Sequence, residues 1–144
     1  MERTAEELID ALGLVPLTDE GGWHRCLWRS ADDATVSCIY YLLKKDERSR
    51  WHRLKANEIW TWHAGGSLET TLGGTGERPV PGAKQVFGPR LGVDSGYLAV
   101  IPAGQWQTTR VADGDFALVS CVVSPAFREE DCYLPHPPIE EELT

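Results

Sequence analysis

The most informative segment of the chain reads Trp51-His52-Arg53-Leu54-Lys55-Ala56-Asn57-Glu58-Ile59-Trp60-Thr61-Trp62-His63-Ala64-Gly65. Two short β-prone runs flank a turn at residues 55–57, which predicts two strands joined by a tight connection. Side chains alternate along a strand, so His52 and Leu54 are expected on one face, and Glu58, Trp60 and Trp62 on one face of the next strand. The segment therefore predicts an imidazole and a carboxylate that converge in a tryptophan-rich setting.

The N-terminal residues predict a single helix over residues 4–13. Thr4 and Glu7 have the spacing of a capping box, apolar residues recur at helical spacing after them, and Gly13 is a typical C-terminal stop. After this helix the pattern changes to short β-rich runs separated by turn signals. The expected strands are Trp23–Arg29, Val36–Leu43, Trp51–Leu54, Glu58–His63, Ser67–Leu72, Tyr97–Ile101, Gln105–Arg110 and Ala117–Val123. Many short strands after one helix predict an all-β sandwich or barrel.

The composition restricts the function classes. A chain of 144 residues fits one domain, and its 22 acidic and 14 basic side chains give a net charge of −8. The acidic excess argues against nucleic acid or an anionic membrane as partner. No apolar stretch is long enough to span a bilayer, and the charged N-terminus lacks a signal-peptide core, so a cytoplasmic protein is expected. The four cysteines form no CxxC pair and are expected to be free thiols.

A second segment completes the pattern, and it reads Gly96-Tyr97-Leu98-Ala99-Val100-Ile101-Pro102-Ala103-Gly104-Gln105-Trp106-Gln107. The two segments resemble the two motifs of the cupin superfamily. His52, Glu58 and Gly65 keep the spacing of the first motif, and the Gly96, Pro102-x-Gly104 and Gln107 positions keep that of the second.

Motifs between Leu12 and Leu134 run in the order seen in the cupin-5 group, a family of single-domain cupins also known as DUF985. This resemblance implies one cupin domain over residues 1–144, a double-stranded β-helix (jelly-roll) barrel over about 22–134, and a loose acidic tail over about 135–144. The group is similar in shape to sugar-nucleotide epimerase cupins, which implies a homodimer.

Two departures from the metal-binding form of the motifs bear on the chemistry. Leu54 and Gln107 stand where two of the usual histidine ligands would be. His52, Glu58 and Gln107 are all competent donors and could hold Fe, Mn, Ni or Zn weakly, but a metal-free pocket is an equal expectation.

The resemblance and the residues together imply a small-molecule site inside the barrel. His52 and Glu58 are the expected catalytic pair, in a pocket lined by residues that would bind the substrate: Trp60, Trp62, Gln107, Trp106, Tyr40 and Arg25. The leading hypothesis is an isomerase, epimerase or lyase that moves a proton on a small carbonyl, sugar-like or acid substrate. The alternatives are a metal-dependent cupin, either a dioxygenase or a metal-assisted isomerase, and a non-catalytic small-ligand binder.

Overall fold

The computed structural model describes residues 2–139. One α-helix precedes the strands, and a single 3-10 turn comes near the end. The elements are α1 (Ala5–Leu12), β1 (Val15–Pro16), β2 (Trp23–Arg29), β3 (Ser37–Lys44), β4 (Arg48–Leu54), β5 (Asn57–Gly65), β6 (Leu68–Leu72), β7 (Lys84–Phe87), β8 (Leu98–Ile101), β9 (Trp106–Val111), β10 (Phe116–Ser124), η1 (Glu129–Asp131) and β11 (Cys132–Tyr133).

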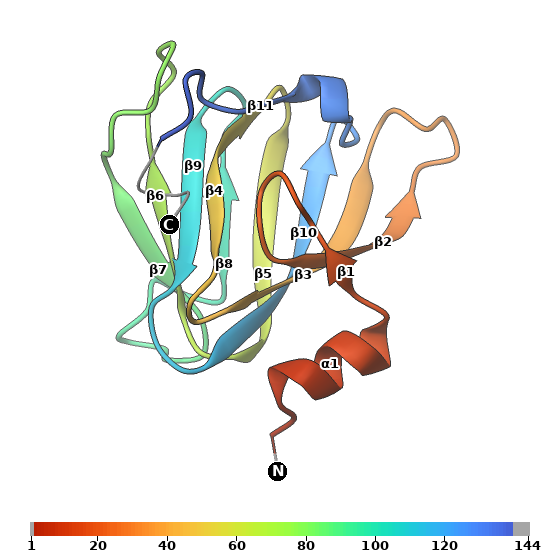
Figure 1. The fold of residues 1–144 in the computed structure, drawn as a ribbon, viewed down its shortest axis with the longest axis vertical. Coiled ribbons are helices and arrows are strands. Elements are labelled where there is room, and N and C mark those ends of the chain that lie inside the picture. Colours follow the sequence, from red (N-terminus) through yellow and green to blue (C-terminus); the bar gives the residue numbers. More distant parts are fainter. Residues whose placement is uncertain (1, 140–144) are drawn as a thin grey trace.

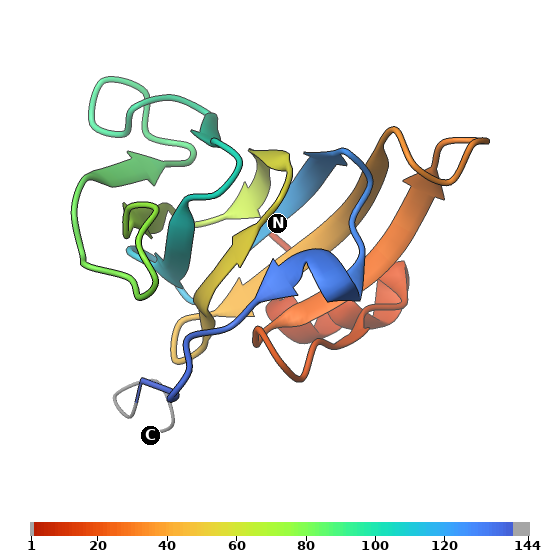
Figure 2. The same ribbon diagram turned by 90° about the horizontal axis from the view of Figure 1, so that it is seen from above.

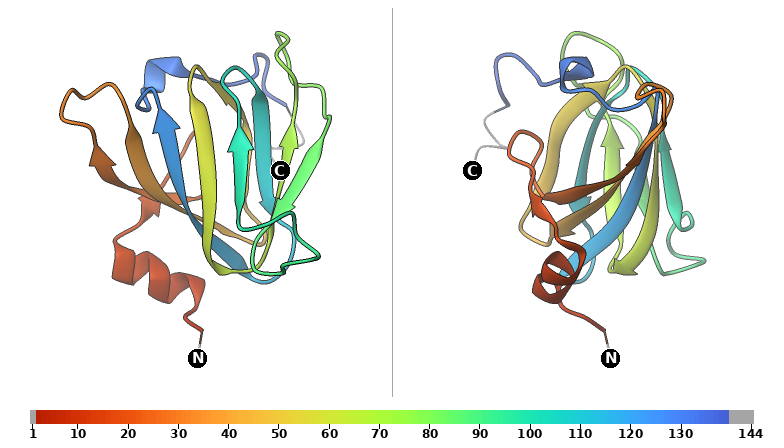
Figure 3. Two further views of the ribbon diagram at one scale, coloured as in Figure 1. Left: turned by 180° about the vertical axis from the view of Figure 1, so that it is seen from behind. Right: turned by 90° about the vertical axis from the view of Figure 1, so that its right-hand side faces the viewer.

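The strands form two antiparallel sheets that face each other (Figures 1 and 3). The larger sheet has the order β1-β2-β3-β10-β5-β8, and the smaller has the order β11-β4-β9-β6-β7. Strands adjacent in sequence fall in different sheets: β4 belongs to the smaller sheet and β5 to the larger. The predicted all-β barrel with one short N-terminal helix is confirmed.

The helix forms where its capping residues predict. Thr4 accepts a hydrogen bond from the Glu7 amide, the Glu7 carboxylate accepts from the Thr4 amide, and Gly13 closes the helix with a left-handed φ of 65°. Its apolar face packs on the outer face of the larger sheet, against Leu42 and Leu118. Figure 2 shows the helix beside β2 and β3, outside the barrel.

The two ends of the barrel interior differ in how they are filled. Toward one end, buried side chains of both sheets fill the space, with Tyr41, Trp60 and Val119 meeting Leu68 and Phe87. Toward the other end, earlier residues of β3 and β5 and later residues of β10 border a cavity. The barrel is therefore packed at one end and hollow at the other, which decides where a ligand can enter.

The predicted strands are found, with shifted ends. β3 confirms the strand expected at Val36–Leu43, and it lies between β2 and β10 in the larger sheet. β4 begins at Arg48, three residues before the expected start at Trp51, so the last residues of the charged stretch 44–50 belong to the strand. Gly65 ends β5 with a φ of 85°, and a Cβ there would lie 2.2 Å from the Phe116 carbonyl oxygen, so only glycine fits.

The C-terminal region is tied to the barrel as far as it is described. β11 pairs with β4, and Arg78 donates to the Pro137 carbonyl at 2.7 Å. Residues 140–144 of the predicted loose tail lie outside the described residues. Within residues 2–139, no helix has the length and apolar character needed to cross a membrane, and the cytoplasmic location stays a prediction.

Candidate functional site

A cavity of about 160 Å³ lies at the hollow end of the barrel. Most of its wall is apolar, and residues of the larger sheet provide the greatest share. The wall consists of Leu17, Glu20, His24, Cys26, Arg29, Ser37, Ile39, Leu54, Glu58, Cys121, Val123, Phe127 and Glu129. The volume is close to the ~150 Å³ that holds a benzene-sized molecule and below the range of drug-sized pockets. The cavity therefore suits a small ligand.

Glu58 is a buried carboxyl group in this wall. It lies on β5, is 6% exposed, and accepts a hydrogen bond from Gln107 Nε2 at 3.0 Å. Burial raises its pKa above the ordinary 4.5, and the nearby Glu20 adds to that, while a positive charge on His52 and the Gln107 hydrogen bond act in the opposite direction. A carboxyl group with a raised pKa in a small cavity is typical of a general acid or base.

His52 is buried and is not one of the wall residues. It is 2% exposed on β4, directly opposite Gln107 on β9. Its Nδ1 lies 2.7 Å from the Arg50 carbonyl oxygen, so Nδ1 carries the proton and donates to that carbonyl. Only Nε2 remains available, and it lies 3.7 Å from Oε2 of Glu20. His52 therefore reaches the cavity wall through its contact with Glu20.

Glu20 is a site residue that the sequence analysis did not assign. It lies in the turn between β1 and β2, lines the cavity, and has a side chain 14% exposed. Its carbonyl oxygen accepts from the Arg50 amide at 2.6 Å, and its Oε1 accepts from the Cys132 thiol at 3.4 Å. No spacing rule connects the turn to the His52 motif, because the two meet only through packing of the turn against β4.

The tryptophans of the motif have different environments. Trp60 is 2% exposed and lies in the packed interior, edge-to-face with Tyr41 and Phe87. Its indole N–H makes no hydrogen bond of ordinary geometry, yet it lies near enough to Glu58 to favour the ionised carboxylate. Trp62 stacks on Tyr97 and donates to the Gly66 carbonyl at 3.1 Å, away from the cavity wall.

Three residues expected to bind substrate lie on outer faces of the sheets. Trp106 donates to the Gly76 carbonyl at 2.8 Å and carries the Arg53 guanidinium 4.7 Å above its ring. Tyr40 packs in the cluster beneath α1, and Arg25 donates to the Leu12 carbonyl at the end of that helix. Adjacent residues of a strand face opposite sides of the sheet. The neighbours of these three residues face the barrel interior, so the three side chains face outward. The structure does not bring them to His52 and Glu58.

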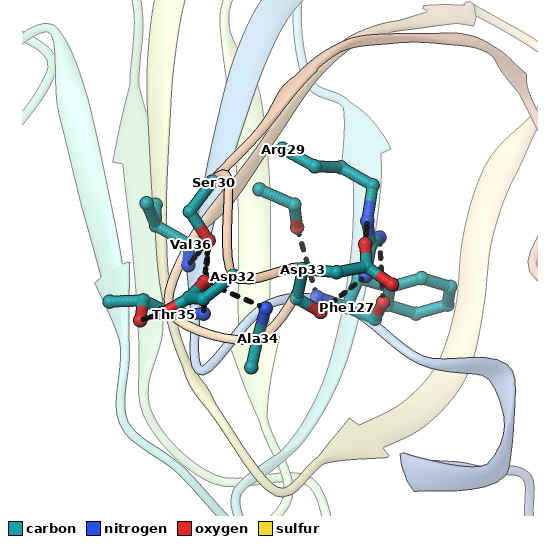
Figure 4. A network of polar contacts seen from close by, with 9 residues as sticks. Arg29, Ser30, Asp32, Asp33, Ala34, Thr35, Val36 and Phe127 are labelled. Atoms are coloured by element: carbon teal, nitrogen blue, oxygen red, sulfur yellow. Dashed lines mark hydrogen bonds and ion pairs between the residues drawn. The ribbon is translucent and has the colours of Figure 1, made fainter.

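A polar network fastens the β2–β3 loop at the cavity (Figure 4). Arg29, a wall residue, donates from Nε to Asp33 Oδ1 at 2.6 Å and from Nη1 to the Phe127 carbonyl at 3.0 Å. Asp32 accepts hydrogen bonds from Ser30 and Thr35, which hold its pKa well below its usual range. The Arg29 guanidinium is thus bound to the loop and to the chain after β10.

Two thiols near the cavity, those of Cys121 and Cys132, are not suited to nucleophilic catalysis. All four cysteines are free. Burial raises the pKa of Cys121, which lines the wall, and that of Cys132, and the charges of Glu20 and Glu58 raise both further. Since a thiolate is the reactive form, both groups are held in the unreactive thiol form.

The residues present do not form a metal site as they stand. The described part of the chain holds no group of three or more His, Cys, Asp or Glu side chains placed to bind one ion. Of the donors expected from the sequence, Gln107 directs its amide N–H toward Glu58, and His52 Nε2 faces Glu20. Leu54 occupies the wall where a further ligand would be needed.

Comparison with known proteins identifies the family. A family model described as "Cupin superfamily (DUF985)" matches residues 6–134. A protein from Shewanella oneidensis is 31% identical, with a TM-score of 0.80 over 92% of this chain and 84% of that one. A hypothetical protein from Leishmania major is 29% identical, with a TM-score of 0.82 over 92% of this chain and 87% of that one.

More distant structures share the fold. The DMSP lyase DddQ from Ruegeria pomeroyi is 18% identical, with a TM-score of 0.58 over 79% of this chain and 51% of that one. A search of curated proteins gave no match. The match of the family model over most of the residues leads to one conclusion: the chain belongs to the cupin superfamily, in the group described by the DUF985 model.

Proposed function

We propose that this cupin is an isomerase or epimerase that moves a proton on a small carbonyl compound bound in the cavity. The observation that carries the proposal is Glu58, a buried carboxyl group with a raised pKa in the wall of a small, mostly apolar cavity. A base whose pKa lies closer to neutrality than an ordinary carboxylate can both take up and return a proton efficiently.

In the reaction on an aldose or ketose, the Glu58 carboxylate removes a proton from the hydroxyl-bearing carbon next to the carbonyl. The electron pair of the broken C–H bond forms a carbon–carbon double bond, and the carbonyl π electrons move to oxygen, which gives an enediolate. Return of the proton to the former carbonyl carbon, with transfer of the hydroxyl proton between the two oxygens, gives the isomer. Protonation of the original carbon on its opposite face, by a solvent water molecule as second donor while Glu58 keeps the first proton, gives the epimer. No external oxidant or reductant is needed.

The neighbours of Glu58 support this role. The Gln107 amide holds one carboxylate oxygen at 3.0 Å and so orients the base. His52 contributes positive charge when protonated, and this stabilises the ionised carboxylate. His52 is then a positioning residue, because it does not line the cavity and its Nε2 faces the Glu20 carboxylate.

Solvent deuterium exchange tests the proposal. The protein is incubated in D2O with a panel of small aldoses, ketoses and 2-oxo acids, and incorporation of deuterium next to the carbonyl is followed by NMR. We expect exchange with at least one compound and its loss in Glu58→Gln, while Glu129→Gln, which removes an exposed carboxylate of the same wall, keeps it. Binding without exchange across the panel would favour the non-catalytic binder.

We also propose a homodimer formed by the outer face of the larger sheet. The register places Trp28, Cys38, Val122, Ile59 and Val100 side by side across five strands. Trp28, Ile59 and Val100 are 56%, 40% and 47% exposed. The row holds no charged residue in a chain of net charge −8, so a second copy can pack there without bringing carboxylates together.

A further inference from the structure

Arg29 faces the cavity because of an irregularity in β2. Cys26 and Trp28 pair with adjacent residues of β3, so Leu27 is an extra residue in the ladder. In a regular strand, residues three positions apart face opposite sides of the sheet. The bulge at Leu27 changes this alternation, and as a result both Cys26 and Arg29 line the cavity.

The Arg29 guanidinium is fixed in place but keeps donors for a ligand. Its Nε donates to Asp33 Oδ1 at 2.6 Å, its Nη2 to the Asp33 carbonyl at 3.4 Å, and its Nη1 to the Phe127 carbonyl at 3.0 Å (Figure 4). An arginine has five N–H groups, so one on each terminal nitrogen is left over among the contacts of the described residues. Two guanidinium nitrogens can donate to one carboxylate, and a side chain that is already held loses little freedom on binding it.

Arg29 and Glu58 lie at opposite ends of one row of cavity residues. Arg29 pairs with Ser37 of β3. On β10, Val123 pairs with Ser37 on one side and with Glu58 of β5 on the other, and all four residues line the cavity. Three strand spacings of about 4.8 Å separate the two charged residues, or about 14 Å between their backbones along the sheet. The floor between them is uncharged.

The carboxylates near Arg29 leave its positive charge available. Asp33, its partner, has a side chain 77% exposed, so water screens that charge. In the wall, Glu129 is exposed and Glu20 lies 3.7 Å from His52 Nε2. A ligand carboxylate at Arg29 also lies far from Glu58, whereas a carboxylate directly beside the reacting carbon would meet the Glu58 charge.

We propose that Arg29 binds the carboxylate of the substrate, and that the substrates are hydroxyaldehyde or hydroxyketone acids of about five or six carbons. Their carboxylate lies at the far end of the chain from the carbonyl group. The carbonyl end then faces Glu58, and the chain lies over Ser37 and Val123. This inference rests on the proposed function, because it names the substrate class of the same site.

Binding measurements with matched probes test the inference without any turnover. 4-Oxopentanoate and 4-oxopentanamide differ only in a carboxylate against a neutral amide at the far end. By NMR titration or calorimetry, we expect the acid to bind at least about tenfold more tightly than the amide. Pyruvate should show no such preference over pyruvamide, because its carboxylate is next to the carbonyl. Equal affinities of 4-oxopentanoate and its amide, or an equal preference in the pyruvate pair, would overturn the inference.

Variants assign the preference to Arg29. Arg29→Gln should reduce the ratio of acid to amide affinity to about one, and Arg29→Lys, which keeps the charge, should retain part of it. The ratio is measured within one variant, so a general weakening of the loop does not change it. Arg25→Gln is the matched control, because it removes the same charge from the same strand but Arg25 donates to the Leu12 carbonyl outside the barrel. A ratio that persists in Arg29→Gln, or one that is lost in Arg25→Gln, would contradict the assignment.

The binding and exchange experiments fail separately. An Arg29-dependent preference for 4-oxopentanoate without deuterium exchange on any hydroxycarbonyl compound would remove the proposed function and leave the carboxylate site intact. Exchange on neutral hydroxyacetone as fast as on 5-hydroxy-4-oxopentanoate would support proton transfer and overturn the substrate class.

Discussion

Replacing Glu58 with glutamine should change how the stability of the fold depends on pH. In the wild-type protein, burial raises the pKa of Glu58 above 4.5, whereas the unfolded chain retains the ordinary value. Between these two pKa values the folded state binds more protons than the unfolded state. The free energy of unfolding therefore falls as the pH rises through this window, and the contribution of the protonated carboxyl group is fully present only below pH 4.5.

The magnitude follows from linkage. Each unit by which the folded pKa exceeds the unfolded one removes about 1.4 kcal/mol of stability once the pH passes both values. Glutamine has the same size, and its amide oxygen can accept from Gln107 Nε2, so the variant keeps the hydrogen bond and loses the titration.

Urea denaturation from about pH 4 to about pH 8 measures the effect. The difference in unfolding free energy, wild type minus Glu58→Gln, should become more negative as the pH rises, with Glu129→Gln correcting for the loss of one negative charge. A difference that stays constant, or one that becomes more positive, would refute the view that burial dominates the electrostatics of Glu58.

Two further outcomes are expected. Leu54→His combined with Gln107→His should create a metal site, so that Zn²⁺ at about 100 times its Kd raises stability by about 2.7 kcal/mol; equal stabilisation of the wild type would show that it already binds metal. Ile59→Lys with Val100→Lys should convert a dimer to a folded monomer in light scattering, and a wild-type monomer at micromolar concentration would exclude the homodimer.

The architecture was largely predictable because local signals agreed with the global fold. The capping box at Thr4 and Glu7, the turn residues and the β-rich runs each specify one conformation. The motif spacing predicted that Glu58 and Gln107 converge, and they meet in a 3.0 Å hydrogen bond although they lie on different sheets. Strand ends were less certain, since β4 extends into a charged stretch that reads as a turn.

The cavity wall was harder to predict, for two physical reasons. The alternation of side chains along a strand was enough to place Trp106, Tyr40 and Arg25. Each is next to a residue that faces inward, so each should have been predicted on the outer face of its sheet. Glu20 carries no such signal. Its approach to His52 depends on the turn packing against β4, a contact between segments far apart in sequence.

The pH dependence of deuterium exchange on the compound of the panel that exchanges fastest tests the central claim most directly, because it reports the protonation state of the base during proton transfer. If Glu58 is that base, the exchange rate should rise with pH along a limb whose midpoint lies above 4.5, and this enzyme-dependent exchange should vanish in Glu58→Gln. A rate that has already reached its plateau at pH 4.5, or exchange that persists in Glu58→Gln, would contradict it.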